Sequence, residues 1–297
     1  MESWIWLPII SALIWSSVNL VDANIRRKYI KNSIVVSAVT GLVSLLVLVL
    51  IPFKGLHYPG LWILVAALSS GIIYVYVLPL YFKALSVEDT PTVIALWYIT
   101  PILIPIMAKF VLNESLTFVQ YIGFFLIIIS GVLISLKDNP LKKICVSKAA
   151  VYIFIAGIII NFTYIFEKYV YSNDSFWNGF ILIQLGTVLG GISMLLIWRK
   201  KIRKFFQKSS IKPISLLSLG ETGNIIAQGL VGAALVVAPV TLVVGFTNLQ
   251  PLFAFILVLL VSKYFPRSYK EEFKPSRIVS LGFAIILLII GMYFIAA

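Results

Sequence analysis

The sequence predicts an all-α integral membrane protein with ten transmembrane helices, arranged as two inverted repeats of five helices each. The first observation is composition: 61% of the 297 residues are hydrophobic and only 12% are charged, whereas soluble domains carry about 25% charged residues. The second is that the apolar runs are continuous over about 20 residues, as transmembrane helices require, and do not alternate as the strands of a membrane barrel do. The third is that similar segments recur in the two halves of the chain.

Ten apolar segments, most of them separated by polar or basic stretches, are predicted to cross the membrane. Their ranges are 4–22, 33–52, 60–82, 91–112, 117–136, 149–171, 176–198, 213–237, 239–262 and 277–296. We place a boundary at Ala238 and Pro239, between the eighth and ninth segments, because proline lacks a backbone donor and stops a helix. No basic region precedes the first segment, so we expect a membrane helix there and not a removable signal peptide.

Lysine and arginine residues indicate how the segments are oriented. Of the 24 such residues, all but Lys54, Lys109 and Lys168 lie in loops or segment ends that follow an odd-numbered segment. Because basic loops stay in the cytoplasm, this distribution predicts a multi-pass protein of the inner (cell) membrane with both termini outside the cytoplasm. The net charge of +13 is explained by these loops, so we expect no nucleic acid partner.

Residues 1–138 and 149–297 are predicted to form the two repeats. Residues 68–85 align with residues 217–234, so that Gly71 matches Gly220 and Ala84 matches Ala233. Five helices per repeat is an odd number, so the second repeat inserts upside down. The charges agree, because the first loop of the first half (IRRKYIK) is basic and its counterpart (YSNDS) is not. Inverted repeats of this kind are typical of secondary transporters, whose solute site lies near the membrane midplane.

Glu221 is predicted to be the single acid placed deep within a membrane segment. An ionisable side chain in hydrocarbon costs about 2.5–3.5 kcal/mol on insertion scales, so it normally faces the bundle interior or a water-filled cavity. Asn224 and Gln228 follow on the same helix face. We expect these three residues to line a central cavity and to bind solute or a proton. The alternative for Glu221 is a structural acid paired with a donor on a neighbouring helix.

Polar and aromatic residues in two other segments are candidates for the same cavity. Asn19 lies one turn after Trp15 on one face of the first segment, and Asn161 and Tyr164 hold a comparable place in the sixth. We expect all four to line the cavity. For Asn161 and Tyr164 the alternative, hydrogen bonding between helices, is equally open.

Three aromatic residues lie in mid-segment, away from the interfacial positions that tryptophan and tyrosine favour. They are Tyr74 in the third segment and Trp97 and Tyr98 in the fourth. We expect them to stack on an apolar or cationic solute, which is worth about 2 kcal/mol or more when water is excluded; packing between helices is the alternative. Pro101 and Pro251 interrupt helix hydrogen bonding in corresponding parts of the two halves and are predicted hinges for alternating access.

The fourth and fifth segments resemble a known family. Pro101, Glu114 in LNESLT and Gly123 in QYIGFFLIIISGVLIS are similar to the EamA-like repeat of the drug/metabolite transporter superfamily, although the second half has no acid at Tyr264, the matching position. The resemblance implies a ten-helix transporter of small metabolites, with a cavity lined by helices one, three, four, six, eight and nine. It also implies cytoplasmic termini, against the orientation that the charges predict, which we follow. Glu114 is interpreted as an architectural turn or cap residue.

These features together predict a secondary active transporter, an exporter of a small cationic or zwitterionic organic metabolite such as an amino acid or amine. We expect it to work by alternating access, driven by protons or by the solute's own gradient, and to act as a monomer in the lipid bilayer. A flippase or transporter of a lipid-linked intermediate, which needs a cavity open sideways to lipid, is the alternative. The sequence contains no Walker motif, Ser-His-Asp set or Cys-x-x-Cys motif, so we expect no enzyme activity, cofactor or metal site.

Overall fold

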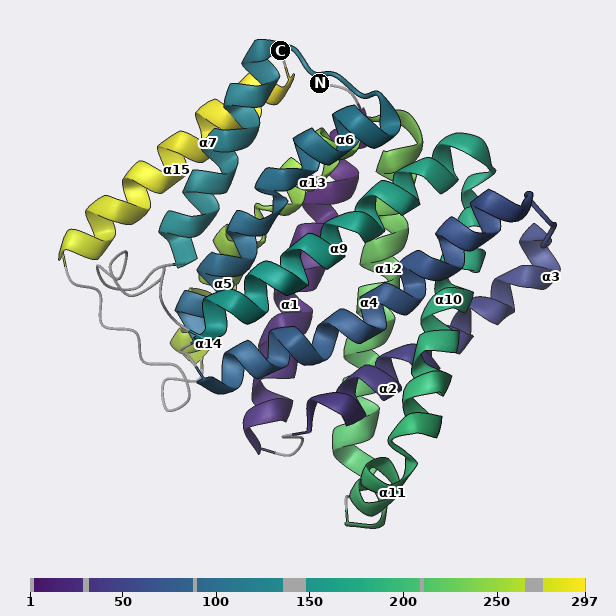
Figure 1. The fold of residues 1–297 in the computed structure, drawn as a ribbon. Helices are drawn as coiled ribbons and strands as arrows, with labels where there is room; N and C mark the ends of the chain where they lie inside the picture. The colour runs from purple at the N-terminus through teal and green to yellow at the C-terminus, as the bar shows by residue number, and fades with distance from the viewer. Residues whose placement is uncertain are drawn as a thin grey trace.

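The computed structural model of the chain describes residues 3–28, 32–87, 90–135, 148–208, 211–264 and 275–296. Within these ranges all regular structure is helical, as the sequence predicts (Figure 1). This architecture suits a membrane, because helices satisfy their backbone donors and acceptors internally and leave none to be solvated by lipid.

Helices cover each of the ten predicted membrane segments, and three of these segments are divided into shorter pieces. The undivided segments are α1 (Trp6–Lys28), α4 (Leu61–Val87), α7 (Phe118–Ser135), α9 (Lys148–Asn173), α10 (Phe176–Ile197), α12 (Ile211–Val237) and α15 (Pro275–Ala296). The divided segments are the second, with α2 (Ser33–Val43), η2 (Ser44–Leu50) and α3 (Ile51–Lys54); the fourth, with α5 (Thr90–Ile99), η3 (Thr100–Leu103) and α6 (Ile104–Leu112); and the ninth, with α13 (Val240–Thr247) and α14 (Gln250–Tyr264). A short η1 (Ser3–Ile5) precedes α1, and α11 (Arg199–Lys208) lies between the seventh and eighth segments.

Seven helical segments among the described residues are long and apolar enough to cross a membrane. They are Ser3–Val21, Ser33–Lys54, Leu61–Ala84, Ala149–Asn173, Phe176–Ile197, Ile214–Val237 and Val240–Leu260. Three shorter apolar helices, Leu96–Leu112, Phe118–Ile134 and Val279–Ile295, occupy the predicted fourth, fifth and tenth segments. The chain is therefore a multi-pass membrane protein, while the count of ten crossings stays a prediction.

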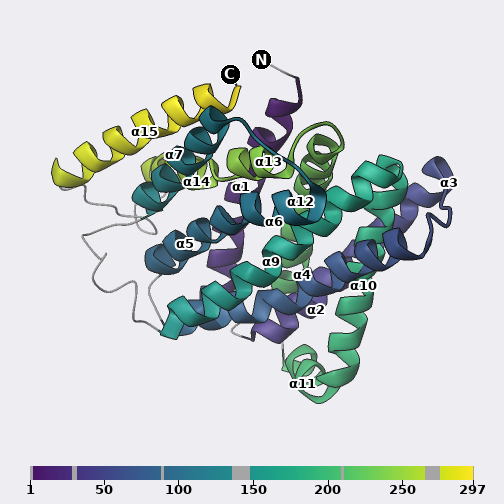
Figure 2. The same ribbon diagram turned by 45° about the horizontal axis from the view of Figure 1, so that its top comes forward.

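Most of the extensive helix contacts join a helix of the first half of the chain to a helix of the second half. Helix α1 packs along α12, and α9 packs along α4 (Figures 1 and 2). Helices α2 and α10 also contact each other, as do α7 and α15. In the predicted repeats α1 corresponds to α9, and α4 corresponds to α12. The α1–α12 pair is therefore the counterpart of the α9–α4 pair. In the α2–α10 and α7–α15 pairs, each helix contacts its own counterpart. Two related repeats would give this pairing, although the α4–α10 contact is more extensive than its counterpart between α2 and α12; the boundaries of the repeats and their inverted relation stay predictions.

The beginning of α1 and the end of α15 lie at one end of the molecule, and α11 lies at the opposite end (Figure 1). Helix α11 has the sequence RKKIRKFFQK, which is strongly basic. The basic charge that this helix carries is therefore separated from the chain ends by the thickness of the bundle, as the predicted orientation requires.

Fusion of a reporter tests this orientation. A reporter that is active only in the cytoplasm is expected to stay silent after Ala297 and to be active when inserted beside α11, because the basic end is predicted to be cytoplasmic. Activity of the reporter in cell assays measures both positions. A strong signal at the C-terminal fusion together with silence beside α11 would reverse the assignment.

Glycine residues allow three helix pairs, α2–α10, α7–α15 and α4–α10, to approach closely. A Cβ atom on Gly191 of α10 would lie 2.6 Å from the Cα atom of Gly41 on α2. A Cβ atom on Gly291 of α15 would lie 2.8 Å from the carbonyl oxygen of Gly123 on α7. At the α4–α10 contact, a Cβ atom on Gly71 would overlap the backbone of α10. Small residues serve this purpose in membranes, where helix association depends on close packing.

Substitution of Gly291 by alanine is expected to destabilise the protein, because the new methyl group would overlap the α7 backbone. Overpacking of this kind typically costs about 1–3 kcal/mol. Thermal unfolding of the purified protein in detergent measures the effect. Gly282 is a matched control on the same helix, because a Cβ atom there meets nothing within 4 Å. Equal midpoints for Gly291→Ala and Gly282→Ala would contradict the close approach.

Candidate functional site

A cavity of about 200 Å³ lies between the helices. Its walls come from α1, α4, α5, η3, α9, α12, α13 and α14, which are the first, third, fourth, sixth, eighth and ninth predicted segments. This is the set of helices that the family resemblance implies. All ten predicted binding residues line the cavity: Trp15, Asn19, Tyr74, Trp97, Tyr98, Asn161, Tyr164, Glu221, Asn224 and Gln228. Pro101 lines it too, and Pro251 does not. The role of these residues in transport stays a prediction.

Glu221 faces the interior of the bundle, where its carboxylate is hydrogen-bonded on both oxygens. The residue is 5% exposed. Its Oε1 accepts a hydrogen bond of 2.7 Å from the hydroxyl of Thr40 on α2, and its Oε2 accepts one of 3.1 Å from Nδ2 of Asn224. The same Asn224 Nδ2 lies 2.9 Å from the hydroxyl of Tyr74 on α4. A buried acid without such partners would be strongly destabilising, so this cluster lets the carboxylate persist and ties α2, α4 and α12 together.

Gln228 extends this polar face along α12. Its Oε1 accepts a hydrogen bond of 2.7 Å from Nε2 of Gln184, a fully buried residue of α10. Gln184 was not predicted from the sequence; no residue of α10 lines the cavity, and Gln184 contacts the cavity wall through this amide pair. The Oε1 atom of Gln184 has no hydrogen-bond partner among the residues that the structure describes.

Pro101 lies where the fourth predicted segment breaks into α5, η3 and α6. Proline lacks the N–H group that would bind the carbonyl of Trp97, and the hydroxyl of Thr100 donates to that carbonyl instead, at 2.8 Å. Asn161 Nδ2 of α9 donates to the carbonyl of Thr100 at 2.7 Å. Trp97 makes an edge-to-face contact with Tyr81, with ring centroids 5.0 Å apart. The predicted interruption at Pro101 is thus present, while its action as a hinge stays a prediction.

The corresponding interruption in the ninth segment lies between α13 and α14, at residues 248–249. Pro251 is buried near the start of α14, where its ring lies close to Gly131 of α7. The hydroxyl of Ser16 on α1 donates to the carbonyl of Gln250 at 2.9 Å. Side chains of neighbouring helices therefore bind backbone carbonyls at both breaks, as irregular backbone at membrane depth requires.

Glu167 on α9 is a second acid in the cavity wall, so the expectation that Glu221 is the single deep acid is wrong. Its Oε1 accepts a hydrogen bond of 3.1 Å from the hydroxyl of Ser70 on α4. The sequence places Glu167 beside Lys168 near the end of a membrane segment, where a charged pair at the interface is the ordinary explanation. The signal that identifies it is helical spacing, because Asn161, Tyr164 and Glu167 follow one another at intervals of three residues on one face.

Lys168 points away from the cavity, toward the break between α12 and α13. Its Nζ donates to the carbonyls of Leu235 and Ala238, at 2.8 and 2.9 Å, and lies 3.6 Å from Oε1 of Glu114. The other carboxylate oxygen of Glu114 accepts a hydrogen bond of 2.9 Å from the backbone N–H of Val240, the first residue of α13. Burial raises the pKa of Glu114 above its usual range, and the Val240 N–H and Lys168 act in the opposite direction. The two side chains thus cap both helix ends at this break.

The cavity extends from the neighbourhood of this capped break toward the other end of the bundle. Glu167 in its wall directly precedes Lys168 of the break, and the wall also includes Tyr81 and Phe82, next to the basic residue Lys83 in the last turns of α4. At the end where the chain begins, Trp4 packs edge-to-face on Phe246 with ring centroids 5.8 Å apart, and both residues are buried. The structure therefore has a polar cavity toward its basic end and a packed core toward its terminal end.

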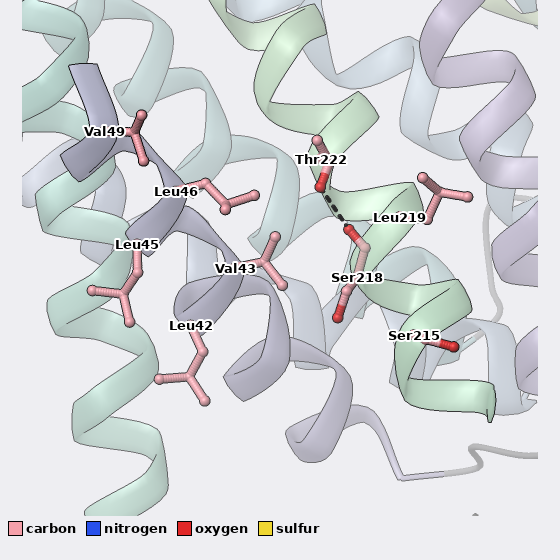
Figure 3. A pocket seen from close by; sticks show the side chains of 9 residues that line it. All are labelled: Leu42, Val43, Leu45, Leu46, Val49, Ser215, Ser218, Leu219 and Thr222. Carbon is pink, nitrogen blue, oxygen red and sulfur yellow. Dashed lines mark hydrogen bonds between the residues drawn. The ribbon is translucent and has the colours of Figure 1, made fainter. Parts of the chain in front are cut away.

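A second hollow lies on the outer surface, between η2 with the end of α2 and the first half of α12 (Figure 3). We call it the outer groove; it has a volume of about 500 Å³ and is lined by Leu42, Val43, Leu45, Leu46, Val49, Ser215, Ser218, Leu219 and Thr222. The hydroxyl of Thr222 donates to the carbonyl of Ser218 in its own helix, so it presents no free donor to the groove (Figure 3). The Thr40–Glu221 hydrogen bond joins the same two helices, α2 and α12.

Substitution of Glu114 tests the capped break. Glu114→Ala removes the acceptor for the Val240 N–H, and loss of such a cap typically costs about 0.5–2 kcal/mol, so its thermal midpoint in detergent should fall. Glu114→Gln keeps a side chain of the same length with an oxygen acceptor, so its thermal midpoint is expected to fall by less than that of the alanine variant. If Glu114→Ala unfolds at the same temperature as the unaltered protein, the cap contributes nothing to stability.

Comparison with known proteins agrees with this architecture. Residues 2–136 match the EamA-like transporter family, which confirms the resemblance found from the motifs of the first half. A solved structure, titled only as the crystal structure of a protein, is similar to the chain with a TM-score of 0.73 and 13% sequence identity, over 99% of this chain and 98% of the other. At that identity the likeness shows the fold alone. No curated protein matches the sequence.

Proposed function

We propose that this chain, whose residues 2–136 match a family of membrane transporters, is a secondary transporter of a small cationic or zwitterionic organic metabolite such as an amine or amino acid. The observation that carries the proposal is Glu221, a buried carboxylate at the wall of a cavity with aromatic and amide sides. Among the described lining residues there is no lysine or arginine. A site of this composition favours a positively charged group and disfavours phosphate.

Glu221 supplies a place where a proton and a cationic solute compete. Both neutralise the same carboxylate, and a buried carboxylate is most stable when neutralised or paired. If the empty carrier returns with a proton and the loaded carrier leaves with the solute, inward proton flow drives export. The cavity toward the basic end and the packed core toward the terminal end support alternating access, since one end is filled while the other holds the site.

Glu221→Gln tests the role of this carboxylate, because the amide keeps the shape of the side chain and cannot exchange a proton. Reconstituted vesicles with radiolabelled amines and amino acids, measured with and without a pH gradient, report the effect. The variant is expected to lose transport driven by the pH gradient. Glu167, Tyr74, Tyr98 and Tyr164 also face this cavity, and they remain in the variant.

Asp174→Asn is the control for removal of an acid, since Asp174 lies outside the cavity, directly after the C-terminal end of α9, where it contacts His57 and Asn178. This control should transport as the unaltered protein does. An unchanged pH response in Glu221→Gln vesicles would remove Glu221 from the mechanism.

The outer groove favours a second candidate function, transport of a lipid-linked intermediate. Leu46, Val49 and Leu219 of the groove are exposed on the surface that faces lipid in a membrane, and an acyl chain would fit against such an apolar wall. Separation of α2 from α12 would then give a sideways opening to the cavity. Vesicles with a fluorescent lipid in one leaflet distinguish the two functions, because only the second predicts its protein-dependent movement to the other leaflet.

A further inference from the structure

Two carboxyl groups from different helices share one cavity. Glu221 belongs to α12 and Glu167 to α9, and both line the same space. Lys168, next to Glu167 in the chain, is turned away and is held by Leu235, Ala238 and Glu114. The described walls of the cavity therefore contain two acids and no basic side chain. Acids that are removed from bulk water favour a bound positive charge for each.

Asn161 lies on the same helix as Glu167 and has an acceptor that no described residue uses. Its side chain is fully buried and lines the cavity. Nδ2 of Asn161 donates to the carbonyl of Thr100, and this contact fixes the amide orientation because a carbonyl oxygen only accepts hydrogen bonds. Oδ1 consequently faces away from that contact, and it has no hydrogen-bond partner among the described residues. Buried polar atoms are normally paired, so an unpaired acceptor on a residue of the cavity wall is a candidate contact for a ligand.

We propose that Glu167 and Oδ1 of Asn161 form a second ammonium site, so that the solute is a linear diamine held at one end by Glu221 and at the other by Glu167. The inference rests on the proposed function, since it names the solute class of the same cavity. An ammonium group has three donors and no acceptor, which suits a carboxylate and an amide oxygen and leaves one donor for a water molecule. Glu221 lines the same cavity from α12, with Asn224 and Thr40 already holding its carboxylate.

Aromatic rings line the space that belongs to the carbon chain of such a solute. Trp97, Tyr98 and Tyr164 all contribute to the cavity wall, and rings of this kind contact methylene groups and ammonium groups favourably. A monoamine would neutralise one carboxylate and leave the other without a counter-charge. The arrangement therefore predicts selectivity for two positive charges at a defined separation.

Competition binding to the full-length protein in detergent tests the proposal, with radiolabelled diaminobutane as the probe. The competitors are linear diamines of increasing length, monoamines of matched length and an α-amino acid of similar size. The best diamine is expected to bind at least about tenfold more tightly than its matched monoamine, or about 1.4 kcal/mol. Glu167→Gln should bring that ratio close to one while monoamines still bind. Asp174→Asn, outside the cavity, should leave the ratio unchanged.

Glu167→Asp gives an independent test, because a shift in the preferred length of the diamine cannot result from loss of folding. Its carboxylate is retained but withdrawn by one methylene group, so the preferred diamine should become longer while the preference for two charges persists. Size-exclusion chromatography checks that each variant is folded. If Glu167→Gln fails this check, the length shift in Glu167→Asp decides the question, and an unchanged optimum overturns the second site.

Other outcomes separate this inference from the proposed function. Equal affinities for diamines and monoamines, both reduced by Glu221→Gln, would overturn the second site and leave an amine transporter. Tighter binding of the α-amino acid than of the diamines would also overturn the second site. The carboxylate of the amino acid would then be expected to accept a hydrogen bond from the unpaired Nδ2 of Asn248 in the cavity wall. Absence of binding by every amine and amino acid would overturn the proposed function itself.

Discussion

A carboxylate buried inside a membrane protein is the constraint on which the rest of this structure depends. Thr40 and Asn224 donate hydrogen bonds to the two oxygens of the Glu221 carboxylate and so offset the cost of its burial. Those donors come from different helices, and Asn224 also contacts Tyr74 on α4, so one charge fixes how α2, α4 and α12 meet. The contact between α2 and α12 in turn separates the polar cavity inside from the apolar outer groove on the lipid side.

The broken helices follow the same rule as the buried charge, since every freed polar group needs a partner away from water. Thr100 and Asn161 bind the carbonyls exposed at the Pro101 break. Glu114 and Lys168 bind the two helix ends at the α12–α13 break. The breaks are therefore not weak points of the fold but places where one helix is bound to another through a side chain. Asn161 does this while it also contributes to the cavity wall.

The sequence alone predicts the helical class and the cavity residues, because both depend on local periodicity. Glu221, Asn224 and Gln228 lie on one face of a single helix, and that face must avoid lipid wherever the helix packs. The hydrogen-bond partners of that face cannot be predicted from the periodicity of the same helix. Thr40 and Gln184 lie on other helices, and nothing in their local sequence distinguishes them from other polar residues in apolar segments. Only the packing of α2 and α10 against their neighbours identifies them.

Glu167 was missed for a physical reason that also explains its position. Adjacent residues on a helix are about 100° apart, so Glu167 and Lys168 point in different directions and belong to different environments. Glu167 faces the cavity with Ser70, whereas Lys168 holds the closed break with Glu114. A single turn of α9 thus carries a wall of the site and the closure of the terminal end. Because the two contacts share one turn of this helix, a movement of the turn that alters one of them is expected to alter the other.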